Sequence, residues 1–259
     1  MRGDLQPEAF SKKAGPMALD PLTLGKLSAV STATITTVLL KKGLRNVWLR
    51  GTRPLRAHQP RVAGPAFTLR FIPVREDVAT PESWASPRST RAAIEAMPEG
   101  SIAVADTMSV NRSAIFGDIL CARMQQRGVA ALVTDGVVRD ARGVLETGFP
   151  VWSQGVAAPP SVTGLTFVGW QEPIACGGVA IYPDDIIVAD DDGAVVIPRA
   201  LLDEVVPAAC EQEKMESWIM SEVLRGVPLM GLYPPNAETQ ARYKEAALKA
   251  LADSDKHHG

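Results

Sequence analysis

The chain has 259 residues, 46% hydrophobic and 22% charged, with 27 Lys and Arg against 29 Asp and Glu. This composition is that of a globular protein and excludes a chain that is disordered over most of its length. The net charge of −2 argues against a dedicated nucleic-acid-binding protein, which would carry a basic face. No apolar run reaches membrane-spanning length, because Lys26 and a Ser/Thr cluster interrupt the best candidate at 22–40.

Residues 1–20 contain two prolines and two glycines, and we expect a loosely ordered lead-in. Pro21 suits a first helical turn, and Lys41-Lys42-Gly43 is typical of a helix end. In chain order, helices are predicted at 21–43, 90–97, 114–127, 201–225 and 237–252. Strands are predicted at 47–50, 61–74 (with an early bulge or turn at Gly64-Pro65), 101–106, 129–134, 150–152, 165–168, 186–189 and 194–197.

The centre of the chain is therefore rich in strands with a few interleaved helices. This pattern predicts an α/β core at 60–200, which would carry any site. A helical N-terminal extension is expected at 1–59, and 201–259 is expected to hold a long helix, a Pro-rich arm (227–236) and a tail.

The cysteines indicate the redox environment. Cys121, Cys176 and Cys210 are odd in number and widely spaced, and the N-terminus lacks a secretory apolar region. We therefore expect reduced thiols and a cytoplasmic protein.

The three histidines restrict the available chemistry. His257 and His258 lie in a polar tail that we expect to be frayed, and His58 lies in a loop-like segment at the surface. Catalytic triads with His and His-ligated zinc or iron sites are therefore not expected. An enzyme of this sequence would rely on carboxylates, arginines, backbone amides and a hard metal ion such as magnesium or manganese.

One segment, 116–140, gathers such groups. Asp118 lies near the start of a helix that ends at Gly128, and the following strand leads back to the turn at Asp135-Gly136. This path places Arg139 and Asp140 near Asp118. The amides of Ile119, Leu120 and Cys121 are expected to be unpaired at the helix N-terminus, an arrangement that suits a substrate carboxylate.

Structural interpretations compete with this one. Asp118 alone is as well explained as a helix N-cap, and Arg139 with Asp140 as a solvated surface pair. Asp135-Gly136 is typical of a turn, and Cys121 of a packed thiol because no histidine lies nearby. The acidic run at 190–192 is a weaker candidate for cation binding, because hairpin turns favour such residues.

The segment GDILCARMQQRGVAALVTDGVVRD resembles the signature of the 4-hydroxy-4-methyl-2-oxoglutarate aldolase family, also called RraA-like after the regulator of ribonuclease activity A. In that pattern an Asp is followed, after twenty residues, by Arg-Asp; here Asp118 is followed by 119–138 and then by Arg139-Asp140. The resemblance continues at 63–70, 148–155 and 177–198, covers about 60–200 well, and covers the flanks less well.

The resemblance implies a swivelling β/β/α sandwich and a role for each motif residue. Asp140 would ligate magnesium or manganese, Arg139 would contact the pyruvyl end and stabilise the enolate, and Asp118 would hold a metal-bound water. Substrate would also be bound around Asp118, by Gly117, Ile119, Leu120 and Cys121.

The resemblance also implies an assembly. Family members form trimers or dimers of trimers with sites at subunit boundaries, so we expect a homotrimer or hexamer. A neighbouring subunit can supply a further acidic residue, for which Glu211, Glu213 and Glu216 are candidates. The apolar residues of the Pro-rich arm would dock on such a neighbour.

The implied function is a metal-dependent lyase that cleaves a 4-hydroxy-2-oxo acid to pyruvate, with oxaloacetate decarboxylation as a side activity. One alternative is a lyase or dehydratase of sugar-derived 2-keto-3-deoxy acids, because the terminal helices could reshape the pocket. Another is a protein-binding regulator of an RNA-processing nuclease, and a third is a metal-binding scaffold without activity. As partner we expect a small 2-oxo acid, with no nucleic acid and no membrane.

Overall fold

The computed structural model describes residues 19–255, which fall into two compact units, Met1–Val206 and Pro207–Gly259. The expectations for residues 1–18 and for the tail with His257 and His258 lie outside the described residues. Within the described part, no single helix has the length and apolar composition to span a membrane; α1 and α2 pass that test only together, bent by 100° at the break between them.

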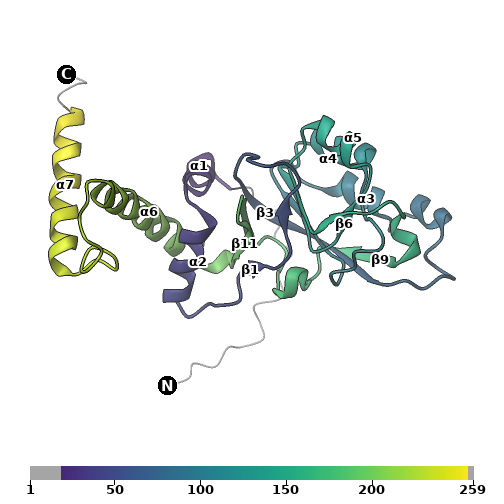
Figure 1. Cartoon of the computed structure of the whole chain (residues 1–259). Helices are drawn as coiled ribbons and strands as arrows, with labels where there is room; N and C mark the ends of the chain where they lie inside the picture. The colour runs from purple at the N-terminus through teal and green to yellow at the C-terminus, as the bar shows by residue number, and fades with distance from the viewer. Residues whose placement is uncertain (1–18, 256–259) are drawn as a thin grey trace. The chain divides into compact units, whose positions relative to one another are not determined.

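The first unit is a mixed α/β fold built on a large mixed sheet (Figure 1). Within the described residues, nine strands share this sheet in the order β1-β11-β10-β3-β4-β5-β7-β2, with β9 paired to β3. They are β1 (Trp48–Leu49), β2 (Arg53–Pro54), β3 (Val62–Pro73), β4 (Ile102–Asp106), β5 (Ala131–Thr134), β7 (Val151–Ser153), β9 (Leu165–Trp170), β10 (Ile186–Asp190) and β11 (Gly193–Ile197).

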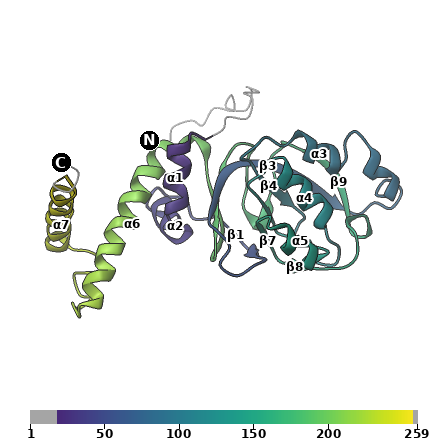
Figure 2. The same cartoon turned by 90° about the horizontal axis from the view of Figure 1, so that it is seen from above.

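The site depends on the parallel part of this sheet. Strands β3, β4, β5 and β7 run parallel, so the segments that follow β4 and β5 leave the sheet at the same edge. Helices α3 (Thr90–Ala96), α4 (Asp118–Gln126) and α5 (Ala141–Thr147) lie along one face of these strands (Figure 2). Their apolar residues, such as Ile94, Met124 and Val144, join strand residues in one buried core.

The prediction of one helix at 21–43 is wrong, because the structure has α1 (Pro21–Ala29) and α2 (Thr32–Lys41). Ser31 caps α2 by accepting a hydrogen bond from the Thr34 amide at 3.1 Å, and Asp20 caps α1 in the same way at Thr23. A capping serine inside an apolar run therefore starts a new helix.

Other departures surround the motif. The helix predicted at 114–127 begins four residues later, at Asp118, and the bulge expected at Gly64-Pro65 lies instead between Arg70 and Phe71. Helix α5 and the two-stranded sheet of β6 (Val137–Val138) and β8 (Gly155–Val156) were not predicted. The remaining predicted strands and helices are present with boundaries shifted by a few residues.

The second unit contains most of α6 (Leu202–Leu224) and all of α7 (Ala237–Asp255). Glu222 is buried and bonds to the guanidinium groups of Arg225 and Arg242. The rings of Trp218 and Tyr243 lie 5.7 Å apart. These contacts give the unit its own internal packing.

Candidate active site

The two halves of the 118–140 motif meet at the N-terminus of α4. Asp118 is the first residue of this helix, and Arg139 and Asp140 follow β6 directly. The Arg139 amide donates a hydrogen bond to the carbonyl of Phe116 at 2.9 Å, which fixes the two segments side by side. The structure therefore brings Asp118, Arg139 and Asp140 to one place.

Two glycines allow the carboxylates to approach the backbone closely. A Cβ atom at Gly117 would lie 2.6 Å from Oδ2 of Asp140, and one at Gly143 would lie 2.6 Å from Oδ2 of Asp118. Each distance is shorter than a van der Waals contact. The carboxylates of Asp140 and Asp118 can thus pack across the α4–α5 junction only because Gly117 and Gly143 have no side chain.

Asp140 has a left-handed backbone, with φ 52° and ψ 44°, at the position before α5. Asp adopts this region more readily than most residues, and such conformations concentrate at functional sites. Its Oδ2 accepts a hydrogen bond from Nε of Arg139 at 3.0 Å. The side chains of Arg139 and Asp140 remain 39% and 45% exposed, so their other polar atoms are open to a ligand.

These residues line a hollow of about 310 Å³, a volume at the lower end of the range for ligand pockets. Part of its wall comes from η2 (Pro81–Ala85), α3 and η3 (Ser161–Thr163). The sequence predicted α3 as a helix, but it did not indicate that any of these three elements belongs to the site. The hollow is lined by Trp84, Thr90, Arg91, Ala114, Ile115, Gly117, Asp118, Ile119, Leu120, Arg139, Asp140, Pro160 and Ser161.

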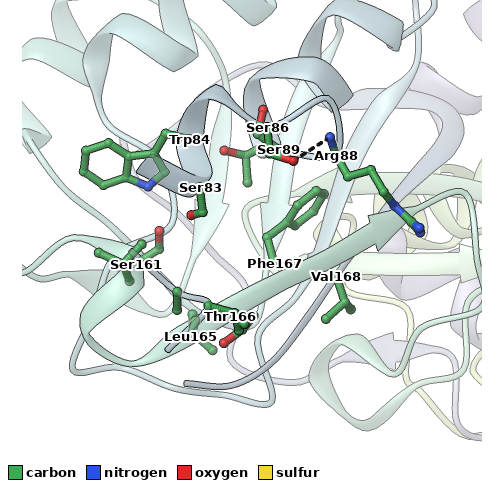
Figure 3. A pocket seen from close by; sticks show the side chains of 14 residues that line it. Ser83, Trp84, Ser86, Arg88, Ser89, Ser161, Leu165, Thr166, Phe167 and Val168 are labelled. Carbon is green, nitrogen blue, oxygen red and sulfur yellow. Dashed lines mark hydrogen bonds between the residues drawn. The ribbon is translucent and has the colours of Figure 1, made fainter. Parts of the chain in front are cut away.

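A second hollow, of about 560 Å³, adjoins the first. Trp84, Thr90 and Ser161 line both. Figure 3 shows this second hollow between the segment that carries Ser83 and Trp84 and strand β9. The two hollows therefore share a wall at Trp84.

The backbone amides at the start of α4 differ from the expectation. The Cys121 amide is not unpaired, because it donates to the Gly117 carbonyl at 3.0 Å, and the Ile119 amide donates to Oδ1 of Asp118 at 2.7 Å. Among the described residues, only the Leu120 amide of these three has no acceptor. Asp118 itself is not the N-cap, which is Gly117.

Cys121 is a packed thiol. It is fully buried, and burial, with a smaller contribution from the charge of Asp118, raises the pKa of its thiol to about 12. A thiol with such a pKa is protonated at neutral pH and is a poor nucleophile. Cys121 therefore contributes packing, and its expected role in substrate binding has no support from its side chain or its amide.

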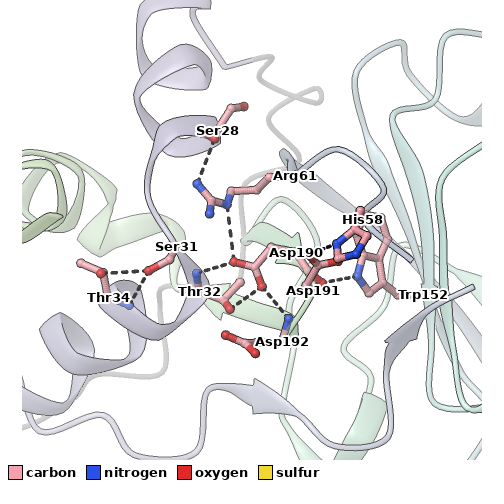
Figure 4. Close-up of polar contacts among 10 residues, drawn as sticks. All are labelled: Ser28, Ser31, Thr32, Thr34, His58, Arg61, Trp152, Asp190, Asp191 and Asp192. Atoms are coloured by element: carbon pink, nitrogen blue, oxygen red, sulfur yellow. Dashed lines mark hydrogen bonds and ion pairs between the residues drawn. The ribbon is translucent and has the colours of Figure 1, made fainter. Parts of the chain in front are cut away.

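The acidic turn at 190–192 has a structural role (Figure 4). The carboxylate of Asp190 is 8% exposed and accepts hydrogen bonds from the amide and hydroxyl of Thr32, at 2.8 and 2.7 Å, and from the Asp192 amide at 3.0 Å. Nε of Arg61 lies 3.4 Å from the same carboxylate. Asp190 therefore ties the start of α2 to the β10–β11 hairpin.

Asp135 is likewise more than a turn residue. It is buried, and its carboxylate accepts hydrogen bonds from the amides of Thr107, Ser109 and Gly177, at 2.8, 3.1 and 3.2 Å. It thus joins the segment after β4 to η4 (Cys176–Gly178).

The donor set at the motif fits a magnesium or manganese ion. Carboxylate oxygens are the ligands these ions prefer, and Asp140 carries no capping hydrogen bond to α5. Within the described residues, no group of three or more His, Cys, Asp or Glu could hold a metal. An ion at Asp140 would therefore take most of its ligands from water and substrate, as Mg²⁺ commonly does. Glu211, Glu213 and Glu216 lie on α6, and their assignment to a neighbouring site stays a prediction.

The chain is similar to known proteins over most of the first unit. The model of the RraA-like family, described as Aldolase/RraA, matches residues 32–196, more than half of the chain. A putative 4-hydroxy-4-methyl-2-oxoglutarate aldolase of Halalkalibacterium halodurans is 34% identical over 153 residues, which are 59% of this chain and 67% of that protein.

Two further proteins extend the comparison. Protein DlpA of Legionella pneumophila is 30% identical over 65% of this chain, but the match spans only 26% of DlpA. The crystal structure of Streptomyces coelicolor RraAS2, described as an unusual member of the RNase ES inhibitor RraA protein family, superposes with a TM-score of 0.70 at 34% identity, over 78% of this chain and 97% of that one.

Proposed function

Because the chain belongs to the RraA-like family, we propose that it is a metal-dependent carbon–carbon lyase that cleaves a 4-hydroxy-2-oxo acid and releases pyruvate. The observation that carries the proposal is the meeting of Asp118, Arg139 and Asp140 at one hollow of ligand size. The finer fold description, a swivelling β/β/α sandwich, belongs to the same proposal.

A divalent ion held by Asp140 would act, when bound, as a Lewis acid on the 2-oxo group. The guanidinium group of Arg139 holds the pyruvyl end and balances the negative charge that develops on the 2-oxo oxygen. The free Leu120 amide, at the N-terminus of α4, donates to the substrate carboxylate.

Asp118 orients a water molecule that accepts the proton of the 4-hydroxyl group. The C3–C4 bond then breaks, its electron pair moves toward the 2-oxo oxygen, and the hydroxyl-bearing carbon leaves as a carbonyl. The same water returns a proton to C3 to give pyruvate. Loss of CO₂ from oxaloacetate generates the same charge on the same oxygen, so decarboxylation is expected as a side activity.

The proposal includes a homotrimer or hexamer with the site near a subunit boundary. Ile119, beside Asp118 on the rim of the hollow, is 79% exposed, an unusual position for a large apolar side chain. In the second unit, Leu229, Met230 and Tyr233 are also exposed. Light scattering at micromolar concentration should give the mass of a trimer or its double, and a monomeric mass would contradict this part of the proposal.

A regulator of an RNA-processing nuclease is the second candidate, favoured by the similarity to RraAS2. A pure binding protein does not need an open Asp118, Arg139 and Asp140 set, so we place it second. The sugar-derived 2-keto-3-deoxy acids remain the alternative substrates within the lyase class.

The test is a coupled assay of pyruvate release over a panel of 4-hydroxy-2-oxo acids, 2-keto-3-deoxy acids and oxaloacetate, with magnesium and with excess chelator. Chelation should abolish release, and magnesium or manganese should restore it. Full activity in chelator, or a borohydride-trapped Schiff base on a lysine, would overturn the mechanism, and no release from any substrate would favour the regulator.

A further inference from the structure

One cationic side chain that lines the hollow has no acidic partner in the described part of the chain. Arg91, at the start of α3, lines the hollow together with Asp118 and Arg139. Among the described residues, no Asp or Glu forms an ion pair with it; Glu95, one helical turn further along, bonds instead to Arg123 and Arg127. By contrast, Arg139 in the same hollow is paired with Asp140. Arg91 is thus a cation of the hollow that has no ion-pair partner among the described residues.

An aromatic ring holds this guanidinium in place. The Cζ atom of Arg91 lies 4.8 Å from the centroid of the Trp84 ring, within the range of a cation–π contact. Such a contact orients the planar guanidinium and leaves its N–H groups free to bind an anion. Arg88, on the same segment, extends away from Trp84 in Figure 3, so the arrangement is particular to Arg91.

We propose that Arg91 determines substrate specificity by binding a second carboxylate at the far end of the 2-oxo acid, and that Trp84 is its positioning residue. The inference rests on the proposed function for one point, that the 2-oxo acid end of the substrate lies at Arg139 and Asp140. The second carboxylate supplies the ion-pair partner that Arg91 lacks, and it can form a bidentate pair with the guanidinium.

A role of Arg91 in binding a second carboxylate favours dicarboxylic 2-oxo acids over sugar-derived 2-keto-3-deoxy acids as substrates. A dicarboxylic 2-oxo acid satisfies both cations of the hollow. A sugar-derived acid presents hydroxyl groups to Arg91 and leaves the guanidinium without an ion-pair partner.

The experiment compares two ligands of the same length, 2-oxoglutarate, with a carboxylate at C5, and 2-oxopentanoate, with a methyl group there. Their dissociation constants are measured by calorimetry with magnesium present. The parent should bind 2-oxoglutarate at least about tenfold more tightly, the size expected for a charged hydrogen bond. Arg91→Met should abolish the preference by weakening 2-oxoglutarate alone, and Arg91→Lys should retain part of it.

Matched variants separate position from charge. Arg142→Met removes an exposed cation of α5 that pairs with Glu146, and it should leave the preference unchanged. Trp84→Leu should reduce the preference, and Trp84→Phe, which keeps a ring under the guanidinium, should restore most of it. Thermal melting establishes that each variant is folded.

The outcomes distinguish this inference from the proposed function. A parent with no preference, a parent that binds neither ligand, or an Arg91→Met variant that keeps the preference would overturn the role of Arg91. If the preference behaves as expected but no pyruvate is released from any 4-hydroxy-2-oxo acid, the role of Arg91 stands and the lyase proposal fails.

Discussion

Two segments of the chain were candidates for cation binding, Arg139-Asp140 and the acidic turn at 190–192, and their carboxylates have opposite roles in the structure. Asp190 is almost fully buried, and each of its carboxylate oxygens accepts hydrogen bonds. Asp140 is about half exposed, and within the part of the chain that the structure describes its carboxylate accepts a hydrogen bond only from Nε of its neighbour Arg139. A carboxylate with saturated oxygens stabilises the fold, whereas one with open oxygens can bind a ligand.

The backbone differs in the same sense. Asp190 ends a regular strand, β10, and its carboxylate bonds to helix α2. Asp140 stands in a left-handed conformation and is packed against Gly117, a position that has no side chain. The partners supplied by the fold, rather than local acidity, therefore distinguish a structural aspartate from a candidate metal ligand.

The largest effect is expected for Asp140→Ala. It removes the one protein ligand assigned to the metal, so metal binding and pyruvate release should be lost together, with release falling about a thousandfold. The melting temperature should stay near that of the parent, because this carboxylate supports little else. Metal titration and the coupled pyruvate assay measure both effects, and a variant that keeps both would move the site elsewhere.

Arg139→Lys should come next. Lysine keeps the charge but loses the planar fork that can bridge a carboxylate and the developing oxyanion. We expect pyruvate release to fall about a hundredfold while metal affinity is unchanged. Steady-state kinetics and metal titration measure the two quantities separately. An equal loss of metal affinity and turnover would mean that Arg139 acts only by supporting Asp140.

Asp190→Asn should have the opposite effect to Asp140→Ala, lowering stability and leaving activity unchanged. The substitution keeps the shape but points an amide N–H₂ group at donors of Thr32 or Asp192, at a cost of about 1–3 kcal/mol in the free energy of unfolding. Activity per folded molecule should equal that of the parent. Urea unfolding followed by the pyruvate assay tests this, and a loss of metal binding would show that the acidic turn belongs to the site after all.

The smallest effect is expected for Gly117→Ala. The added Cβ would lie 2.6 Å from the terminal oxygen of Asp140, which can rotate away, and 3.2 Å from Cγ of Arg139, whose flexible side chain can shift, so the fold should tolerate it. The displaced carboxylate should reduce metal affinity and turnover about tenfold, as misplaced catalytic groups commonly do. Gly25→Ala is a suitable comparison for the loss of a glycine, since no atom lies within 4 Å of its added Cβ and its backbone is not left-handed. Unchanged kinetics in Gly117→Ala would indicate that the position of Asp140 is not fixed by this contact.

The proximity of Asp118 and Arg139 could be predicted from the sequence because it depends on the lengths of one helix and of the strand that follows it. A helix that ends at Gly128, followed by a short strand, returns the chain to its starting point, and these elements are present. Helix α5 escaped prediction because it is short and begins after a left-handed Asp140; Gly148, with φ 75°, was the available signal for its end.

The rest of the hollow could not be predicted because distant segments build it. Trp84, Arg91 and Ser161 lie at least 20 residues from the motif residues they face, and no spacing in the sequence links them. Likewise, the saturation of Asp190 depends on Thr32, 158 residues away. Local chemistry identified the candidate residues, and only the tertiary fold separated open carboxylates from saturated ones.

We propose that the open carboxylate of Asp140, and not the hydrogen-bonded carboxylate of Asp190, supports chemistry on a 2-oxo acid. The most direct measurement is the exchange of pyruvate methyl protons with D₂O, followed by NMR with magnesium for the parent, Asp140→Ala and Asp190→Asn at a temperature where all three are folded. The parent and Asp190→Asn should catalyse exchange, and Asp140→Ala should show none above the rate in buffer. Exchange by Asp140→Ala at the parent's rate, or its loss in Asp190→Asn alone, would contradict this proposal.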